Sequence, residues 1–520
     1  MNKAYSLNYV KIYLWKILGL ISGFVSMLIV IPKLTAEPSI YGIYTICVSL
    51  SVYLSYADIG FLSAGQKYAA EYYAKDDTVS EIKVIGFVHF ILFLFISVFA
   101  IVSLIISLRP TILFNYFTQK DYIIASRILL VLSVSSFVVL FQRFAQSVFI
   151  IRIEDYVYQR IEVIFNIIKI ISVFYFFRSG HYDIISYYIC FQLVSLVSCI
   201  VCILIIKKRY NYDMKLVLYN FRFSRIIYFR VQKLAFSTLF VTIMWILYYE
   251  LDTIMIGKLY GAKAIATYAI GLSILSFTRS LYGTLFGPFL ARINHFAGRN
   301  EFDQLDTFLF DIIRVTFPVS IIPAITLIIM MPELIVAWVG LNYIDSIIIA
   351  QFLISLVLFY CFINPLNYLI IAKEKVKVIY TTSFSLAFIF LVIFFLLKNQ
   401  YGIVAMAIAK SVSIVFYVAI LLLISSKFVK HSLIKLIINL LVRILIPVAV
   451  LLIILYLLRP IWKEGNVKSI FGVIRIGVTG GIASVVAISG FYILDGRSRK
   501  LLKSVFINVF PYFKKGSTFS

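Results

Sequence analysis

Charged residues and the residue types that build catalytic centres are scarce in this chain. Only 14% of its 520 residues are charged, Asp and Glu together number 23, and there are four histidines and five cysteines. No metalloprotease, serine-hydrolase, Walker or dinucleotide-binding motif stands in a usable context. The scattered histidines and cysteines predict neither a metal site nor a disulfide framework. We therefore expect a protein that is not an enzyme, with no catalytic residue, no metal and no cofactor.

Apolar residues are abundant instead. Hydrophobic residues make up 62% of the chain, aromatic residues 17%, and the mean hydropathy is +1.01. Runs of about 20 apolar residues recur between short polar loops, which matches helices that cross a hydrocarbon layer of about 30 Å. The sequence predicts an all-α polytopic membrane protein with about 14 transmembrane helices. The expected spans are residues 10–32, 39–61, 83–107, 122–148, 159–177, 182–206, 234–257, 264–290, 305–330, 344–371, 376–397, 402–425, 437–458 and 470–493.

Basic residues lie mostly in the loops on one side of this arrangement. Residues 207–233 hold eight Lys and Arg against one acid, Asp213, and the net charge of the chain is +25. Between the spans bounded above, the loops and termini on that side hold 25 Lys and Arg, and the opposite loops hold 10. Short Lys- and Arg-rich loops stay in the cytoplasm, so we expect both termini to be cytoplasmic. The positive charge predicts contact with anionic lipid rather than with nucleic acid.

Short segments recur six spans later at nearly one offset. The matching pairs are Tyr44 and Tyr268, residues 150–154 and 370–374, and Tyr182 and Tyr401. Because six spans is an even number, the repeats enter the membrane in the same direction. We predict two parallel six-helix repeats plus two extra C-terminal helices. The expected domains are a lobe at 1–206, a basic cytoplasmic linker at 207–233, a second lobe at 234–425, and the two additional helices with a basic cytoplasmic tail at 426–520.

Several short segments occur in the order found in one group of exporters. They are Tyr41-Gly42-Ile43-Tyr44, Tyr56-Ala57-Asp58-Ile59-Gly60, Asp252 to Gly257 with Gly261 and Tyr268, and Asn364-Pro365 to Lys375. Over residues 5–425 the chain resembles the multidrug/oligosaccharidyl-lipid/polysaccharide exporter superfamily. Within that superfamily it resembles the polysaccharide or O-antigen repeat-unit flippases.

The resemblance implies a flippase of the bacterial inner membrane. Its cargo would be an undecaprenyl-diphosphate-linked oligosaccharide repeat unit for O-antigen or capsule biosynthesis, moved by alternating access. Pro318 and Pro323 are expected to break the ninth span. The break would either shape a static bundle or act as a hinge. The expected partners are the lipid-linked oligosaccharide, membrane lipids, and a polysaccharide polymerase with other glycan-assembly proteins. Two alternatives remain, a cation-coupled multidrug exporter of the same superfamily and an inert scaffold within a glycan-assembly complex.

Charged residues within the predicted spans are the candidate site residues. A charge at mid-bilayer costs at least about 2.5–3.5 kcal/mol on insertion scales, so such residues normally face a bundle interior or a wet cavity. The residues are Arg127, Arg143, Lys169, Arg279, Arg314, Lys410, Arg443 and Arg475 among the cations, and Asp58, Glu162, Glu250, Asp252 and Asp311 among the acids. Those near a span end, such as Arg127 and Arg443, can reach the head groups instead.

Four of the cations form the substrate-binding hypothesis: Arg279, Lys410, Lys169 and Arg314. A diphosphate needs cationic hydrogen-bond donors, which these side chains supply. Arg279 is the first choice because it lies about midway along the eighth span. The alternatives are structural. Arg314 and Asp311 are three residues apart and could pair on one helix face, and Lys169 could belong to a polar seam between helices.

Four acids form the ion-coupling hypothesis, with a proton or sodium as the coupling ion: Glu250, Asp252, Glu162 and Asp58. Two neighbouring carboxylates repel each other when both are charged, which suits Glu250 and Asp252 to hold a proton or a cation. The alternative is an interfacial belt, in which Tyr248 and Tyr249 face the head groups and the two acids are solvated.

Overall fold

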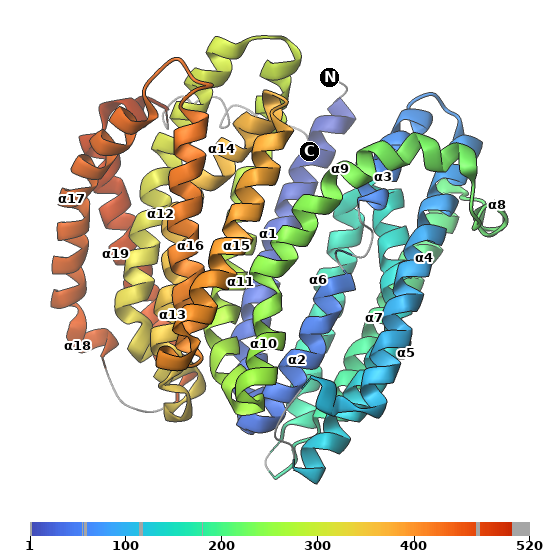
Figure 1. Cartoon of the computed structure of the whole chain (residues 1–520), viewed down its shortest axis with the longest axis horizontal. Coiled ribbons are helices and arrows are strands. Elements are labelled where there is room, and N and C mark those ends of the chain that lie inside the picture. Colours follow the sequence, from blue (N-terminus) through green and yellow to red (C-terminus); the bar gives the residue numbers. More distant parts are fainter. Residues whose placement is uncertain are drawn as a thin grey trace, which may run out of the picture. The chain divides into compact units, whose positions relative to one another are not determined.

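The structure is a computed structural model that describes residues 3–54, 56, 60–113, 118–178, 180–463 and 468–501. Throughout these residues the chain is helical and has no strand (Figure 1). The helices are α1 Lys3–Leu34, α2 Pro38–Leu54, α3 Phe61–Tyr73, α4 Thr78–Leu108, η1 Pro110–Ile112, α5 Gln119–Ile151, α6 Asp155–Phe176, α7 Ile184–Tyr210, α8 Met214–Tyr219, α9 Arg225–Tyr249, α10 Leu251–Tyr260, α11 Ala262–Gly298, α12 Phe302–Val339, η2 Leu341–Tyr343, α13 Ser346–Ser355, η3 Leu356–Phe359, α14 Tyr360–Ala372, α15 Val376–Tyr401, α16 Val404–Ser425, α17 Leu433–Leu457, α18 Arg459–Trp462 and α19 Ile470–Leu494. The chain forms two compact units, Met1–Ala269 (unit 1) and Ile270–Ser520 (unit 2).

Each of the fourteen predicted spans overlaps with helix in the described residues, although α2 ends at Leu54, seven residues before the expected end of the second span. Within the described residues, twelve helical stretches are long and apolar enough to cross a membrane. The remaining two spans correspond to α2, which has 17 residues, and α6, which has 22. The hydropathy of α6 is lowered by its charged side chains, which include Glu162 and Lys169. The helices confirm the predicted all-α, multi-pass membrane protein.

Two helices differ in detail from the expected spans. The seventh span is interrupted at Glu250, which separates α9 from α10. The ninth span is not broken, because α12 runs on through Pro318, Pro323 and Pro332. Membrane helices tolerate proline where neighbouring helices surround the freed backbone groups, and α12 packs against α13, α14, α17 and α19. The expected break at Pro318 and Pro323 is therefore wrong.

Polar side chains fix where several helices begin. Asp77 precedes α4 and accepts a hydrogen bond from the backbone N–H of Ser80. Thr118 and Asp121 form a capping box at the start of α5, in which each side chain accepts from the other residue's backbone N–H. These contacts satisfy N–H groups that the first helical turn leaves without a partner. The polar loops of the sequence thus set the helix starts.

Unit 1 is built on long helices packed along one another. α4 packs along α5, α1 along α6, and α3 against α4, while α5 also contacts α2 and α7 (Figure 1). Its hydrophobic core includes the fully buried side chains of Phe87, Phe149 and Cys202. α9 contacts α3, and α10 contacts α2. The polar residues between α9 and α10 are thereby brought against α2.

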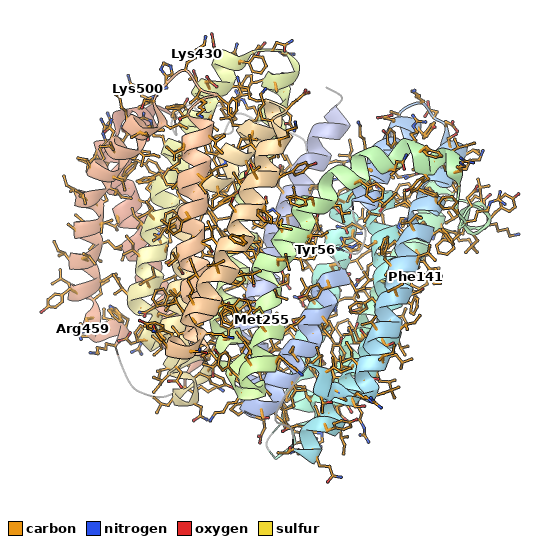
Figure 2. All side chains as sticks on the ribbon, viewed as in Figure 1. Tyr56, Phe141, Met255, Lys430, Arg459 and Lys500 are labelled. Carbon is orange, nitrogen blue, oxygen red and sulfur yellow. The ribbon has the colours of Figure 1, made fainter. Side chains whose placement is uncertain are left out.

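Unit 2 is organised around α12. This helix contacts α13, α14, α17 and α19, and α15 packs along α16 (Figure 1). α17 and α19 also pack against each other, so the two C-terminal helices attach to the unit through α12. Lys430 and Lys500 lie at one end of the unit and Arg459 lies at the opposite end (Figure 2).

Helix-ending turns recur in the two units, 221 to 224 residues apart. Positive φ angles occur at Asp76 and Asn300, at Ile153 and Glu374, and at Gly180 and Gly402. In the first two pairs, the positive-φ residue donates its N–H to the carbonyl three residues back, and the next residue donates to the carbonyl five residues back. This is the hydrogen-bonding pattern of a Schellman turn. Matched turns support an internal repeat. The compact units divide within α11, and the lobes at 1–206 and 234–425 stay a prediction.

Candidate functional site

A buried carboxylate cluster lies where α9, α10 and α11 meet in unit 1. The side chain of Asp252 is fully buried. One of its oxygens accepts a hydrogen bond from the Tyr268 hydroxyl at 2.6 Å, and the other accepts from the backbone N–H of Thr253 at 3.0 Å. The carboxylate is thus held between α10 and α11 by one hydroxyl and one backbone amide.

Glu250, which lies between α9 and α10, links this cluster to α2. Its backbone carbonyl accepts a hydrogen bond from the Tyr53 hydroxyl at 3.0 Å, and its carboxylate accepts from the Tyr56 hydroxyl at 3.3 Å. Thr253 donates to the hydroxyl of Ser49 on α2 at 3.0 Å. The structure therefore brings Glu250 and Asp252 together at one set of tyrosine and hydroxyl groups, which we call the Asp252 cluster.

The surroundings of this cluster exclude the interfacial-belt alternative. Tyr248 is fully buried, and Tyr249 is 6% exposed. The Tyr249 ring stacks on Trp245 with a centroid distance of 5.2 Å. Because the tyrosines and Asp252 are covered by protein, they do not form a solvated belt at the membrane surface. The cluster is an internal polar site.

Gly42 of the Tyr41-Gly42-Ile43-Tyr44 segment explains how α2 can lie so close. A Cβ added at Gly42 would stand 1.8 Å from the carbonyl oxygen of Ala262, the first residue of α11. Only glycine permits this contact, since a Cβ at that distance would force the backbones apart. The close approach of α2 to α11 helps to position the helices that carry the Asp252 cluster.

A second polar group follows α6. The Lys169 side chain is 8% exposed, and its Nζ lies 4.2 Å from the centroid of the Phe191 ring on α7. Glu162, two turns earlier on α6, accepts a hydrogen bond from the Ser198 hydroxyl of α7 at 3.1 Å. Asn166 of the same helix donates to a serine of α1. The stripe therefore faces α7 and α1.

Lys410 and Arg279, two of the four predicted substrate-binding cations, lie on different helices of unit 2. Lys410 on α16 is fully buried, and its Nζ lies 6.0 Å from the centroid of the Phe390 ring. Arg279 is half-buried on α11. Asp58, one of the four predicted coupling acids, lies outside the described residues.

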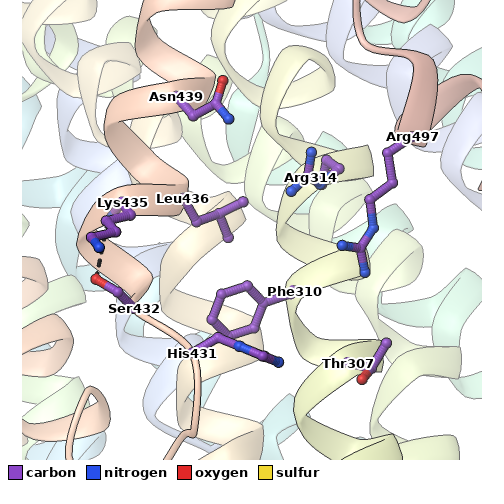
Figure 3. A pocket seen from close by; sticks show the side chains of 9 residues that line it. All are labelled: Thr307, Phe310, Arg314, His431, Ser432, Lys435, Leu436, Asn439 and Arg497. Atoms are coloured by element: carbon purple, nitrogen blue, oxygen red, sulfur yellow. Dashed lines mark hydrogen bonds between the residues drawn. The ribbon is translucent and has the colours of Figure 1, made fainter.

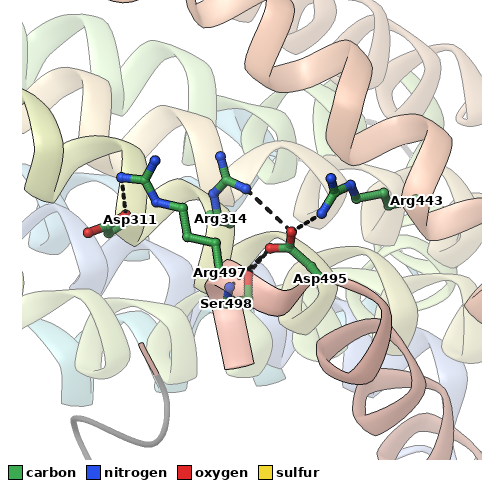
Figure 4. Close-up of polar contacts among 6 residues, drawn as sticks. All are labelled: Asp311, Arg314, Arg443, Asp495, Arg497 and Ser498. Carbon is green, nitrogen blue, oxygen red and sulfur yellow. Dashed lines mark hydrogen bonds and ion pairs between the residues drawn. The ribbon is translucent and has the colours of Figure 1, made fainter. Parts of the chain in front are cut away.

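Arg314 pairs with the segment that follows α19 (Figure 4). Its guanidinium lies 3.4 Å from Asp495, which also pairs with Arg443. Asp311 pairs instead with Arg497 at 3.3 Å. The structure does not form the alternative Arg314–Asp311 pair on one helix face, because the C-terminal segment supplies a partner to each residue.

Asp495 is the centre of this group, which we call the Asp495 network: Asp495, Arg314, Arg443 and Ser498. The carboxylate is fully buried and accepts from the backbone N–H of Ser498 at 3.2 Å and from its hydroxyl. Burial alone would raise the pKa of Asp495, but the hydrogen bonds from Ser498 and the charges of the two arginines hold that pKa below its usual value. Asp495 is therefore ionised and holds α12, α17 and the end of α19 together.

A buried ion pair in unit 1 was absent from the sequence-based candidates. Arg152 binds Glu81 through two hydrogen bonds of 2.8 and 3.2 Å, with both side chains almost fully buried. The guanidinium also lies 4.8 to 5.1 Å from the ring centroids of Tyr73, Tyr210 and Tyr212. Hydropathy could not reveal the pair, since both residues stand just outside predicted spans.

Comparisons with known proteins place the fold. The MatE family model matches residues 238–342, which include Glu250, Asp252, Arg279 and Arg314. No curated protein sequence matches significantly. The structure of lipid II flippase MurJ in an inward closed conformation is similar, with a TM-score of 0.71 and 17% identity, covering 95% of this chain and 99% of that chain.

Two multidrug transporter structures are similar over a smaller part of this chain. An inward-facing MATE family transporter of the MOP superfamily has a TM-score of 0.60 and 12% identity, covering 80% of this chain and 95% of that one. A point mutant of the Vibrio cholerae MATE transporter VcmN has a TM-score of 0.53 and 13% identity, covering 82% and 97%. The matched family and structures belong to transporters and a flippase, not to enzymes. The chain is a multi-pass membrane protein with the fold of these MOP-type transporters.

Proposed function

We propose that this protein is a flippase for a lipid-linked oligosaccharide, such as an undecaprenyl-diphosphate-linked repeat unit of a surface polysaccharide. The observation that carries the proposal is the share of this chain that each similar structure matches. The lipid II flippase structure matches 95% of this chain, whereas the two MATE structures match 80% and 82%. The remaining fifth corresponds in size to residues 426–520, which hold α17 and α19. Two helices beyond the exporter core favour a cargo that includes a long lipid chain.

The proposed cargo explains why cations would be kept inside membrane helices. A diphosphate is bound best by charged donors in a poorly solvated site. Lys169 and Lys410 are buried in their respective units, and Arg279 is half-buried. We assign these three residues to the polar head of the cargo. Arg314, the fourth predicted cation, belongs to the Asp495 network and is considered below.

The Asp252 cluster is the proposed site of ion coupling. Asp252 and Glu250 would take up a proton or a sodium ion while the two repeats alternate between inward- and outward-open states. Glu162 and Asp58 are the other acids in this hypothesis. The support is the burial of Asp252 and its hydrogen bonds with the Tyr268 hydroxyl and the Thr253 N–H.

We propose the bacterial inner membrane as the location, with both termini in the cytoplasm. The bias of Lys and Arg toward one set of loops supports this orientation. In this setting the partners are the lipid-linked oligosaccharide, the surrounding lipids, and a polysaccharide polymerase with other glycan-assembly proteins.

Replacement of Arg279 tests the proposed role of the intramembrane cations in cells. We expect Arg279→Ala to abolish surface glycan display while the protein level and membrane insertion stay normal, because the diphosphate loses a charged donor. Arg279→Lys keeps the charge and is the matched control, with display partly retained. Normal glycan display by Arg279→Ala would remove Arg279 from the mechanism.

A cation-coupled multidrug exporter is the second candidate, favoured by the MatE match to residues 238–342. Such an exporter would be expected to recognise cationic drugs through acidic groups. Deletion of the gene separates the two candidates. Loss of surface glycan with unchanged drug sensitivity supports the flippase, and the reverse result supports the exporter.

A further inference from the structure

A polar pocket opens in unit 2 beside the start of α17 (Figure 3). Its volume is about 340 Å³. The polar side chains that line it are Thr307 and Arg314 from α12, His431, Ser432, Lys435 and Asn439 from α17 and the two residues before it, and Arg497 from the segment after α19. Three separate parts of the chain therefore direct donors at one space.

The pocket carries more positive charge than the neighbouring acids balance. In the Asp495 network one carboxylate serves two guanidiniums, and Asp311 pairs with Arg497. Arg443 lies outside the lining, so Lys435 brings the cationic side chains that line the pocket to three, with Arg314 and Arg497, and no carboxylate is among the lining residues. The Nε of Arg314 is also buried and has no hydrogen-bond partner among the described residues. An anion with several acceptor oxygens fits this surplus.

The next acids along α12 do not cancel that surplus within the pocket. Asp303 pairs with the Lys430 ammonium at 2.5 Å, and Asp306 accepts from the Lys430 backbone N–H at 3.1 Å. Neither acid lines the pocket. Their charge is directed at Lys430, so the donors of the pocket remain available to a ligand.

The helix beside the pocket carries an exposed apolar stripe. On α17, Ile434, Ile438, Val442 and Leu445 are 54%, 56%, 61% and 64% exposed. Their spacing of three to four residues places them along one face. In a membrane this face contacts acyl chains, and it begins at the same turn as the pocket. Lys430 and Lys500 lie at this end of the unit (Figure 2), the end that the charge bias assigns to the cytoplasmic leaflet, where anionic lipids are enriched.

We propose that this pocket binds a phosphate group, supplied by an anionic membrane lipid whose chains lie along α17. Lys435, Arg497 and the Nε of Arg314 donate charged hydrogen bonds to the phosphate oxygens, and Asn439 and Thr307 add neutral ones. The bound lipid is a resident of the protein rather than its cargo, so the site does not depend on the proposed flippase activity. A free phosphate ion carries the same oxygens, and the experiment separates the two sources.

Native mass spectrometry of the full-length protein, released from nanodiscs of phosphatidylglycerol and phosphatidylcholine, tests the site. Lys435→Gln and Arg497→Gln should each reduce retained phosphatidylglycerol about fivefold, the effect expected for one basic residue at an anionic surface. Both side chains are exposed, so the variants should fold. Lys435→Arg should retain the lipid. Lys500→Gln is the matched control, because Lys500 is exposed at the same end and does not line the pocket.

The outcomes distinguish the source of the phosphate. Loss of phosphatidylglycerol in both Gln variants but not in Lys500→Gln, with no displacement by millimolar inorganic phosphate, supports the lipid site. Displacement by inorganic phosphate with the same dependence on Lys435 and Arg497 supports the pocket and overturns the lipid as its source. Equal retention in wild type and both Gln variants, or equal retention of phosphatidylcholine, overturns the proposal.

Discussion

The turns that end α5 and α14 have the same backbone but different side-chain contacts. Arg152 follows α5 and Lys373 follows α14, each just before a residue with positive φ. Arg152 forms a buried ion pair with Glu81. Lys373 instead lies over the Phe302 ring, 4.0 Å from its centroid. The same helix ending is thus held by an ion pair in unit 1 and by a cation–π contact in unit 2.

The position that matches Glu81 explains the difference. α4 begins at Thr78 and α12 begins at Phe302, so Glu81 corresponds to Leu305. Both side chains are fully buried. Unit 1 buries a carboxylate at this position and unit 2 buries a leucine. Lys373 of unit 2 therefore contacts an aromatic ring instead of a carboxylate. The comparison teaches that this turn requires a well-packed neighbour and a partner for its cation, but that the partner does not have to be a carboxylate.

The largest expected effect comes from removing one half of the ion pair. Glu81→Gln leaves the Arg152 guanidinium buried without a carboxylate, which should lower the free energy of unfolding by about 3–5 kcal/mol. Denaturant unfolding of the purified protein measures the loss.

The double variant Glu81→Leu with Arg152→Met makes unit 1 resemble unit 2 and sharpens the comparison. Replacing both buried charges by apolar groups is often close to neutral. We therefore expect it to be more stable than Glu81→Gln alone. If the double variant is the less stable of the two, the ion pair is required and the comparison fails.

Asp495→Asn should have the next largest effect. The change removes the carboxylate shared by Arg314 and Arg443, and we expect a loss of about 2–3 kcal/mol, less than at Glu81 because the Arg443 side chain is 38% exposed. Asp311→Asn is the control, with an effect below about 1 kcal/mol, since its partner Arg497 is 55% exposed. Equal effects of the two variants would contradict the assignment of Asp495 as the centre of the network.

Asp495 also makes the free energy of unfolding depend on pH. Because the folded-state pKa of Asp495 lies below its usual value, its contribution is complete above the unfolded pKa of about 3.9 and is lost as the pH falls through the lower folded value. Wild type should lose more stability than Asp495→Asn on acidification in this range. Parallel pH profiles for the two proteins would contradict the ionised network.

Replacing Asp252 should lower the stability less than the changes above, but it should impair transport more. Asp252→Asn keeps an acceptor for the Tyr268 hydroxyl and should cost about 1 kcal/mol. It removes the charge, so we expect transport to lose its dependence on a proton or sodium gradient. Tyr268→Phe removes the same hydrogen bond but keeps the carboxylate, and should retain the gradient dependence. Unchanged gradient dependence in Asp252→Asn would exclude this acid from coupling.

The smallest effect is expected at the unit 2 turn. Lys373→Met removes a cation–π contact of a half-buried lysine and should cost about 0.5–1 kcal/mol. Denaturant unfolding of Lys373→Met and of Glu81→Gln under the same conditions compares the stability contributed by the turns after α14 and α5. A loss as large as that of Glu81→Gln would show that Lys373 has a stronger partner than the ring of Phe302.

The spans were predictable because each depends on local composition. The cost of burying a segment in hydrocarbon is a property of its own residues, and hydropathy therefore located α4, α7 and α16. The interruption at Glu250 was not predictable in this way. Glu250 there accepts hydrogen bonds from Tyr53 and Tyr56, which are far away in the sequence and outside any local composition window.

The candidate site was predictable as a set of residues but not as a set of pairs. Sequence position identified Asp252 and Lys169 as unusual charges in apolar runs. It offered Asp311 as one alternative partner of Arg314, because helical spacing is the only pairing rule that a sequence offers. The observed partners, Arg497 and Asp495, belong to a segment more than 180 residues later, and only the packing of α19 on α12 brings them near.

Transfer of a labelled lipid-linked oligosaccharide between leaflets of proteoliposomes tests the central claim most directly. A fluorescent undecaprenyl-diphosphate oligosaccharide placed in both leaflets should become fully accessible to an impermeant quencher when wild type is present. Only the outer half should be quenched in liposomes with Arg279→Ala or without protein. Incomplete quenching with wild type, together with uptake of a cationic dye by the same liposomes, would contradict the flippase and support the exporter.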